Sequence, residues 1–187
     1  MPSDDKKQTI FDILRFALIT LIIVIPVRAY VAQPFIVSGV SMVPTFENGE
    51  YLIIDEMSYH FRSPKRGEVV VFRYPKDPSK FYIKRVIGLP GESLNISSAG
   101  INIQSADGKN IKLDEPYIAD GTIYSYETVT LGENEYFVMG DNRNSSSDSR
   151  IWGPVADKLI KGRVGLRLFP IKTAEVLPGD FSTNNNQ

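Results

Sequence analysis

The sequence of 187 residues contains no cysteine and a single histidine, His60. The absence of cysteine excludes a disulfide-stapled scaffold, a thiol nucleophile and cysteine-rich zinc sites. One histidine leaves almost no room for a histidine metal site, and we expect no metal and no other cofactor. An excess of one charge is also missing, since 21 Lys and Arg face 22 Asp and Glu. A nucleic-acid-binding protein would show a basic patch, so no nucleic-acid partner is expected.

Apolar residues make up 42% of the sequence and are concentrated near its start. Residues 10–27 are almost wholly apolar, and no charge occurs from Phe16 to Val27. At about 1.5 Å rise per residue this segment is roughly 27 Å long as a helix, close to the hydrocarbon thickness of about 30 Å. Asp12 and Arg15 lie near its N-terminal end, where they can pair at i,i+3.

Three interpretations of this segment compete. A cleaved signal peptide would end in a small-x-small site, of which residues 28–32 are a poor version. A buried core helix would show a polar face, but only Thr20 is polar from Ala17 to Val27. We favour a single membrane-spanning anchor. The excess of Lys and Arg on its N-terminal side predicts a cytoplasmic N-terminus and an extracytoplasmic remainder.

The remaining sequence is typical of β structure. Short runs rich in β-branched and aromatic residues occur at 51–54, 68–74, 81–87, 135–139 and 163–169. Turn signals with Gly, Pro, Asn or Asp separate them. No second helix of convincing length is predicted.

Three segments carry residues suited to chemistry. In the first, residues 33–46, Ser41 lies in a loop punctuated by Gly and Pro, where a hydroxyl can be held exposed; such loops are more often plain turns. In the second, residues 81–91, period-two alternation places Tyr82, Lys84 and Val86 on one face of a strand. Lys84 is then either an edge-strand lysine with a solvated head or a desolvated amine with a lowered pKa, able to serve as a base for a serine.

The third segment, residues 140–150, is a run of small, polar and charged residues between two apolar stretches. It is either a flexible surface connection or a rigid loop held by internal pairing. Asp148 and Arg150 can pair across one residue if the chain is extended there. The mixture of acids and arginines at close range favours the rigid loop.

Together the three segments resemble the conserved boxes of bacterial-type (type I) signal peptidases, a family of serine endopeptidases with a Ser-Lys dyad. The boxes are SMVPT at 41–45, KRVIGLPG at 84–91, and GDNR followed by SSDSR at 140–143 and 146–150. Their order and spacing match the family, as does the upstream apolar segment. The resemblance covers residues 10–169.

The resemblance implies a role for each matching residue. Ser41 is the expected nucleophile and Lys84 its general base, while Ser146 is expected to orient the lysine. The backbone N–H of Ser41 is an expected oxyanion donor. Some members carry a serine two residues before the nucleophile as a second donor; here Gly39 stands there, so Ser38 is only a candidate. Endoplasmic-reticulum and archaeal relatives use His in place of the lysine, but His60 lies outside every box and is expected to be an ordinary histidine.

The resemblance also implies a substrate and residues that contact it. Secretory preproteins are the expected partners, cut after a small-x-small pattern such as Ala-x-Ala at the end of the signal peptide. Expected to wall the substrate pockets are Phe35, Val37, Met42, Phe46, Tyr82 and Ile83, each of which can equally be plain core. Expected to structure the loop are Asp141, Asn142, Arg143, Asp148 and Arg150.

The predicted fold is mainly β: a coiled antiparallel β-sheet catalytic domain with a small inserted β cap, preceded by one N-terminal transmembrane helix. The predicted divisions are a cytoplasmic tail (1–9), the anchor (10–32), a peptidase domain (33–181) with its cap (92–131), and a disordered tail (182–187). The expected location is the plasma membrane, single-pass, with the lipid bilayer as a partner and the export translocon nearby.

Other functions are compatible with parts of this pattern. A self-cleaving Ser-Lys repressor would need a DNA-binding helical domain where this chain has an apolar segment. A non-catalytic module that binds exported peptides would not need Ser41, Lys84 and Ser146 together. A processing enzyme dedicated to one class of surface protein is not separable from a general one by sequence.

Overall fold

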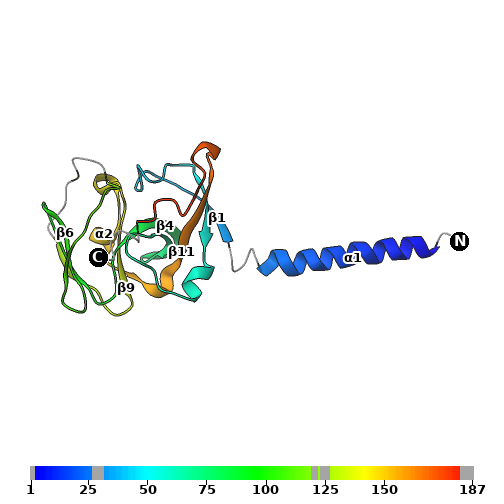
Figure 1. The fold of residues 1–187 in the computed structure, drawn as a ribbon, viewed down its shortest axis with the longest axis horizontal. Coiled ribbons are helices and arrows are strands. Elements are labelled where there is room, and N and C mark those ends of the chain that lie inside the picture. Colours follow the sequence, from blue (N-terminus) through cyan, green and yellow to red (C-terminus); the bar gives the residue numbers. More distant parts are fainter. Residues whose placement is uncertain (1–2, 27–31, 119–121, 123–126, 182–187) are drawn as a thin grey trace.

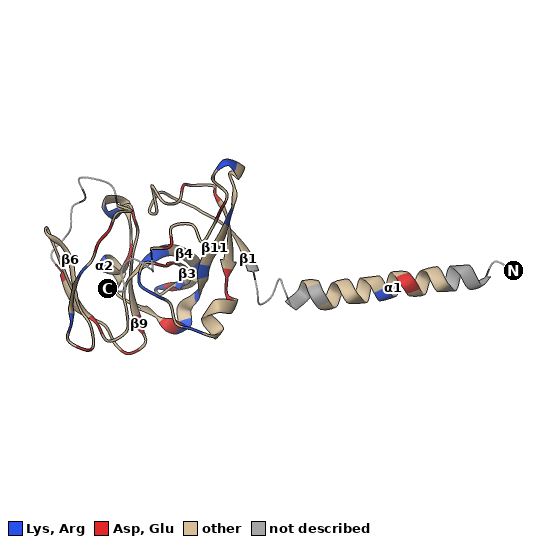
Figure 2. Ribbon diagram, in the orientation of Figure 1, with Lys and Arg blue, Asp and Glu red and all other residues tan. Residues whose placement is uncertain are grey.

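The computed structural model describes residues 3–26, 32–118, 122 and 127–181. The N-terminal segment forms one helix, α1 (Ser3–Pro26), which lies outside the β sheets (Figure 1). Many apolar side chains of α1 are exposed, including Phe16 at 73%. Figure 2 shows acidic and basic colour near the middle of the helix, where the sequence has Asp12 and Arg15. Within the described residues, no helix reaches the combination of length and apolarity needed to cross a membrane. The predicted anchor, residues 10–32, begins inside α1, and its last residue is the first residue of β1 (Ala32–Ile36). Residues 27–31 of the anchor and the predicted disordered tail lie outside the residues described.

The larger sheet has eight strands, with the order β1-β2-β11-β3-β4-β9-β10 and β12 paired to β11. Its strands are β1 (Ala32–Ile36), β2 (Tyr51–Asp55), β3 (Val69–Tyr74), β4 (Asp77–Gly88), β9 (Glu135–Met139), β10 (Val155–Ala156), β11 (Ile160–Phe169) and β12 (Glu175–Val176). Every pairing in it is antiparallel. The mainly β, antiparallel fold expected from the sequence is therefore confirmed, and the five predicted runs all lie on strands of this sheet.

The smaller sheet has four strands in the order β7-β6-β5-β8, and these strands come between β4 and β9 in the sequence (Figure 1). Its strands are β5 (Ser93–Ser97), β6 (Gly100–Gln104), β7 (Asn110–Lys112) and β8 (Glu127–Thr130). Short helical segments complete the described structure: η2 (Met57–His60), η3 (Arg143–Ser145), α2 (Ser149–Trp152), η4 (Asp157–Leu159) and η5 (Ile171–Thr173).

Strand β3 lies at the centre of the larger sheet and is covered on both faces. Val69 and Val71 belong to one buried cluster, whereas Val70 and Phe72 belong to another. A strand buried on both sides is expected to be a continuous apolar run, which explains the uninterrupted VVVF sequence here. This rigid centre supports the neighbouring strand β4, which carries Lys84.

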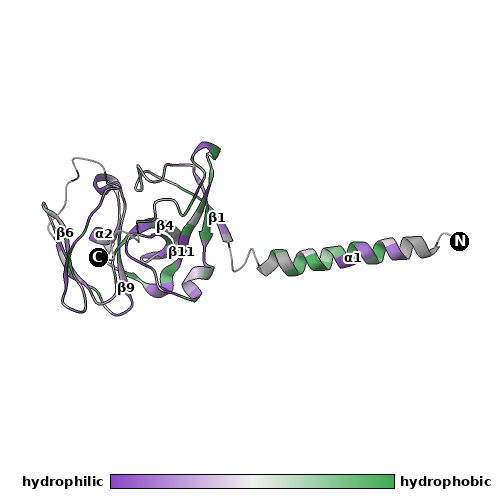
Figure 3. Cartoon of the chain, in the orientation of Figure 1, coloured by the Kyte–Doolittle hydropathy of each residue, from purple (hydrophilic) through white to green (hydrophobic). Residues whose placement is uncertain are grey.

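The smaller sheet packs against the far ends of β4 and β9. Ile87, Phe137 and Met139 of the larger sheet share one buried cluster with apolar residues of the smaller sheet. Gly88 lies at the junction, where an added Cβ would come within 2.7 Å of Leu94 and 2.8 Å of Leu131. Glycine at this position therefore allows the two sheets to approach closely. Figure 3 shows the smaller sheet with alternating hydrophilic and hydrophobic colours, as expected for strands with one buried face.

Candidate active site

Ser41 lies in a compact turn that follows β1. The amide of Gly39 donates to the side-chain Oδ1 of Asn48 at 2.9 Å, and Gly39 has φ +98°, a conformation that favours glycine. Met42 and Phe46 are 1% and 0% exposed and fix the inner side of the turn in the core. The turn therefore holds Ser41 half-buried at the surface instead of leaving it on a loose loop.

Lys84 reaches Ser41 from the middle of β4. Its Nζ donates to Ser41 Oγ at 2.7 Å and to the carbonyl of Ile83 at 2.9 Å. Lys84 is only 5% exposed. Of the two alternatives for this lysine, the structure therefore has the desolvated amine and not the edge-strand lysine with a solvated head. Burial lowers the pKa of Lys84 to about 8, while the nearby carboxylates of Asp148 and Asp141 act in the opposite direction. A lysine with this pKa is largely protonated at neutral pH but gives up its proton within the range in which enzymes work.

The next residue, Arg85, points to the opposite face of β4 and is fully buried. Its Nε donates to Asp141 Oδ1 at 2.8 Å, and its second terminal nitrogen donates to Asp141 Oδ2 at 2.5 Å. Asp141 also accepts a hydrogen bond from the Thr45 hydroxyl, and Thr45 belongs to the same turn as Ser41. Sequence reasoning gave Arg85 no role, although its place directly after Lys84 in a family box was a signal that could have identified it.

The segment 140–150 is a rigid loop. Asn142 donates from its backbone to the carbonyl of Ser41 at 3.0 Å and from its side chain to the carbonyl of Val40 at 3.1 Å. Arg143 is buried, donates to the carbonyl of Gly140 at 2.9 Å and forms an ion pair with Glu115. The loop is therefore anchored directly on the backbone of the Ser41 turn.

Asp148 and Arg150 pair as predicted, but not in an extended chain. Both guanidinium bonds to the Asp148 carboxylate measure 2.8 Å. Asp148 is the N-cap of α2 and accepts from the Arg150 amide, so the pair closes over the first turn of a short helix. Its carboxylate also accepts a hydrogen bond from the amide of Gly140, at 3.1 Å. The N-cap preference of Asp explains why a helix begins there.

Ser146 lies beside Ser41, with Gly140 between them. A Cβ on Gly140 would overlap both the Ser146 hydroxyl and the Ser41 carbonyl, so only glycine allows this approach. The Ser146 hydroxyl oxygen is buried, but the two hydrogen bonds of Lys84 go to Ser41 and Ile83. The predicted hydrogen bond between Ser146 and Lys84 is thus not among those that Lys84 forms. The role of Ser146 in orienting the lysine stays a prediction.

A groove of about 530 Å³ runs from the Ser41–Lys84 pair along β1 and β4. Four of the predicted pocket residues line it: Phe35, Val37, Tyr82 and Ile83. Met42 and Phe46 do not line it but pack in the core beneath, because they anchor the turn from inside. Lining residues that sequence reasoning missed are Ile36, Gly39, Val40, Val71, Lys80, Phe81, Ser145 and Ser147.

The other predicted residues occupy simpler positions. Ser38 is exposed and lines the same groove. His60 lies on η2, outside the groove lining, exposed, with its Nδ1 3.1 Å from the carbonyl of Glu56.

The groove has unpaired strand edges along both walls. Strand β9 pairs with β4 only at Arg85, Val86 and Gly88, so within the described residues the edge before Arg85 is open on that side. In the part of the chain that the structure describes, β1 is the last strand of the sheet path and pairs with β2 alone. An extended peptide can add its backbone to such edges.

Comparison with known proteins places most of this chain in one family. The family model described as "Signal peptidase, peptidase S26" matches residues 10–169. A probable signal peptidase I-2 of Synechocystis sp. is 39% identical over 86% of this chain and 73% of its own length. A probable signal peptidase I-1 of the same organism is 35% identical over 90% of this chain and 87% of its own length.

A crystal structure of a signal peptidase I from Enterococcus faecalis V583 aligns with 55% of this chain and 97% of that chain, at 28% sequence identity and a TM-score of 0.46. The family expected from the three boxes is confirmed by the family model and the sequence relatives. The chain belongs to the peptidase S26 family of signal peptidases and is a serine endopeptidase.

Proposed function

We propose that this enzyme removes N-terminal signal peptides from secretory preproteins, cutting after a small-x-small pattern, with Ser41 as nucleophile and Lys84 as general base. The observation that carries the proposal is the 2.7 Å hydrogen bond between Lys84 Nζ and Ser41 Oγ at the end of an open groove. The signal peptidase I relatives support the substrate class.

The reaction follows from this pair. Neutral Lys84 accepts the hydroxyl proton of Ser41 while Oγ attacks the scissile carbonyl, giving a tetrahedral oxyanion. The oxyanion accepts a hydrogen bond from the backbone N–H of Ser41, with Ser38 as a second candidate donor. Collapse breaks the C–N bond, and protonated Lys84 returns the proton to the leaving amine. Lys84 then deprotonates a water molecule that attacks the acyl ester, and it returns this proton to Ser41 Oγ as the ester C–O bond breaks.

The groove suits an extended apolar peptide. The open edges of β1 and β4 offer backbone hydrogen bonds, and apolar side chains such as Val37 and Ile83 line the space beside Ser41. Shallow apolar walls near the nucleophile favour small side chains at the positions that face them, which accounts for a small-x-small preference.

The long helix α1 is proposed to be the membrane anchor, with the N-terminus cytoplasmic and the β domain on the extracytoplasmic side. Exposed apolar side chains along α1 support this, since such a surface needs a non-aqueous environment. The uncharged sequence from Phe16 onward gives the helix a strongly hydrophobic C-terminal half (Figure 3). An enzyme anchored in this way would meet signal peptides at the bilayer, near the export translocon.

Activity should depend on pH through Lys84. The base must be neutral, so kcat/KM is expected to rise with pH and to reach half of its plateau near pH 8, the pKa to which burial lowers Lys84. Below that value the rate should fall about tenfold per pH unit. The measurement is cleavage of a peptide substrate from pH 6 to 10, with folding monitored at each pH. A profile that is flat or falls between pH 6 and 8 would contradict a neutral-lysine base.

The substrate proposal is tested with detergent-solubilised full-length enzyme and a preprotein whose signal peptide ends in Ala-x-Ala. We expect one cut directly after the second alanine, identified by mass spectrometry. Replacing that alanine by phenylalanine should lower cleavage by about 10²-fold or more, because a large side chain does not fit a small pocket. The matched control changes the intervening x residue instead. Equal cleavage of the alanine and phenylalanine substrates would overturn the proposed specificity.

A further inference from the structure

The C-terminal residues 177–181, here called the strap, complete the surroundings of buried Arg85. The carbonyl of Gly179 accepts a hydrogen bond from Arg85, and the ring of Phe181 lies 5.1 Å from its guanidinium carbon. Besides the two hydrogen bonds to Asp141, the body of the domain contributes the carbonyl of Gly67 at 2.7 Å and the ring of Tyr117 at 3.9 Å. Arg85 is therefore enclosed partly by residues 94 or more positions later in the sequence.

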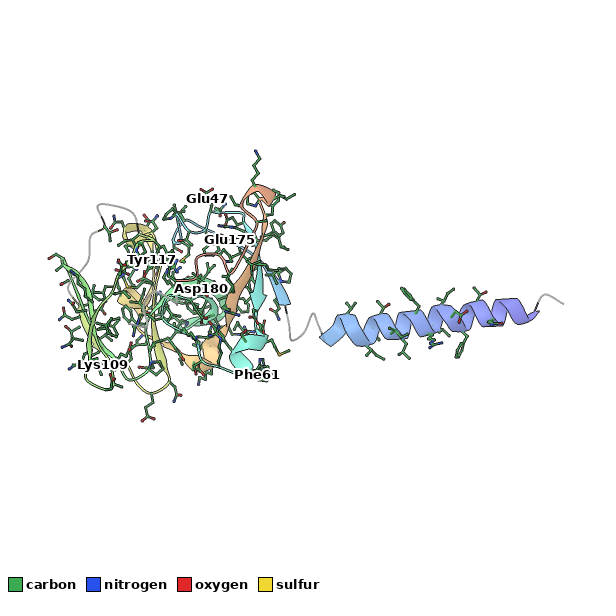
Figure 4. All side chains as sticks on the ribbon, in the orientation of Figure 1. Glu47, Phe61, Lys109, Tyr117, Glu175 and Asp180 are labelled. Carbon is green, nitrogen blue, oxygen red and sulfur yellow. The ribbon has the colours of Figure 1, made fainter. Side chains whose placement is uncertain are left out.

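The strap lies outside the part of the chain that matches the family model, which ends at residue 169. It is nevertheless fastened to the peptidase core. The amide of Leu177 donates to the carbonyl of Gly165 at 2.8 Å, and the amide of Phe181 donates to the carbonyl of Gly67 at 3.4 Å. Phe181 also packs on Tyr117, with ring centroids 5.1 Å apart; Figure 4 labels Tyr117 and Asp180, the strap residue that precedes Phe181.

Gly179 makes the closest approach of the strap to the Ser41 turn. Its φ is +69°, and an added Cβ would overlap the Cγ2 atom of Thr45. Any other residue there would have to displace either the strap or Thr45. The backbone of the strap is thus in direct contact with the turn that carries the nucleophile.

The Arg85 centre is connected to both reacting groups. On one side, Arg85 follows Lys84 on the same strand, so its fixed head limits movement of β4 at the base. On the other side, Asp141 binds both Arg85 and the Thr45 hydroxyl. Asn142, the next residue, donates to the carbonyl of Ser41 at 3.0 Å. A shift of the Arg85–Asp141 pair would therefore be transmitted through Asn142 to the backbone of Ser41.

Loss of the strap would leave a buried cation without one acceptor and without one of its aromatic covers. A buried charge with an incomplete set of partners is strongly unfavourable and recovers by moving toward water. Movement of Arg85 would draw Asp141 with it, because the two are joined by two hydrogen bonds.

We propose that the strap is a positioning element for the Ser41–Lys84 pair. Gly179 and Phe181 complete the contacts around the Arg85–Asp141 ion pair, and this holds the turn that carries Ser41 at hydrogen-bonding distance from Lys84. The proposal rests on the proposed dyad. It places residues beyond the family match among those that determine the rate of the chemical step, although none of them touches the reacting atoms.

The test compares full-length variants on a preprotein substrate. Phe181→Ala is expected to lower kcat by about tenfold or more, since displacements of about 1 Å can cost as much as 10²-fold, with KM changed by about twofold or less because the groove is untouched. Phe181→Tyr keeps the ring over Arg85 and should restore kcat to within about twofold. The matched control is Val176→Ala, an apolar truncation in β12, directly before the strap, at a side chain that is 71% exposed. A second control removes residues 182–187.

Folding is checked separately by thermal unfolding and near-ultraviolet circular dichroism. If Phe181→Ala does not fold, Phe181→Leu, which keeps an apolar cover, takes its place with the same expected direction. Unchanged kcat in the folded variant, or a loss of kcat that Phe181→Tyr does not restore, would overturn the strap proposal. Ser41→Ala separates the dyad proposal from the strap proposal. If Ser41→Ala stays active, the proposed dyad is wrong. If Ser41→Ala is inactive while Phe181→Ala is fully active, only the strap proposal is rejected.

Discussion

Ser41→Ala is expected to lower the rate of preprotein cleavage by about 10³-fold or more, because the acyl-enzyme can no longer form and only positioning and oxyanion stabilisation remain. The variant should still bind substrate, since the groove along β1 and β4 is unchanged. The measurement is single-turnover cleavage, together with a binding assay that uses the same preprotein.

The control for this variant is Ser145→Ala. Ser145 lines the same groove and is exposed, so the chemical change is identical while the dyad stays intact. Activity of Ser145→Ala should remain within about threefold of the parent enzyme, as expected for a surface substitution. Comparable losses in both variants, or substantial turnover by Ser41→Ala, would show that the nucleophile lies elsewhere.

Lys84→Arg should be almost as inactive, with a loss of about 10³-fold, because a guanidinium stays protonated at any pH that the protein tolerates. The substitution keeps the positive charge, so it separates a role as base from a role as mere counter-charge to Asp148 and Asp141. Raising the pH should not recover activity in this variant, whereas it should increase activity in the parent enzyme.

The matched control is Lys80→Arg, because Lys80 also lines the groove but is exposed and pairs with Asp77 at 3.0 Å. It should leave kcat and its pH profile unchanged. If Lys84→Arg retained activity with a similar rise near pH 8, the titrating group would have to be another residue, and the proposed base would be wrong.

Local sequence pattern was enough to predict the main strands, whereas the resemblance of the three boxes to a known family supplied the candidate dyad. The run at 69–72, three valines and a phenylalanine, has the β-branched and aromatic composition of a strand, and it forms the central strand β3. Alternation along 81–87 placed Lys84 beside apolar neighbours, and the lysine is buried there. These features depend on residues close in sequence, so a pattern of period two is sufficient to predict them.

Local pattern was not enough wherever a side chain has distant partners. Met42 and Phe46 were expected in the substrate groove, but the direction in which a turn presents its side chains depends on what it packs against, and both point into the core. Arg85 has the character of a surface residue in the sequence, and only the convergence of Asp141, Tyr117 and the strap explains why it is fully buried. The hydrogen-bond partner of the Ser146 hydroxyl likewise depends on how the loop 140–150 packs against the rest of the domain.

The sequence by itself determined the family, the mainly β fold, and the identity of the serine and lysine candidates, because boxes of fixed spacing and strand periodicity are properties of the chain. The tertiary structure alone decided that Lys84 lies 2.7 Å from Ser41 with a lowered pKa, that open edges of two strands form one groove, and that the C-terminal strap closes over Arg85. Hydrogen bonds and desolvation act over a few ångströms in space, and residues 41, 84, 141 and 179 come within that range only when the chain has folded.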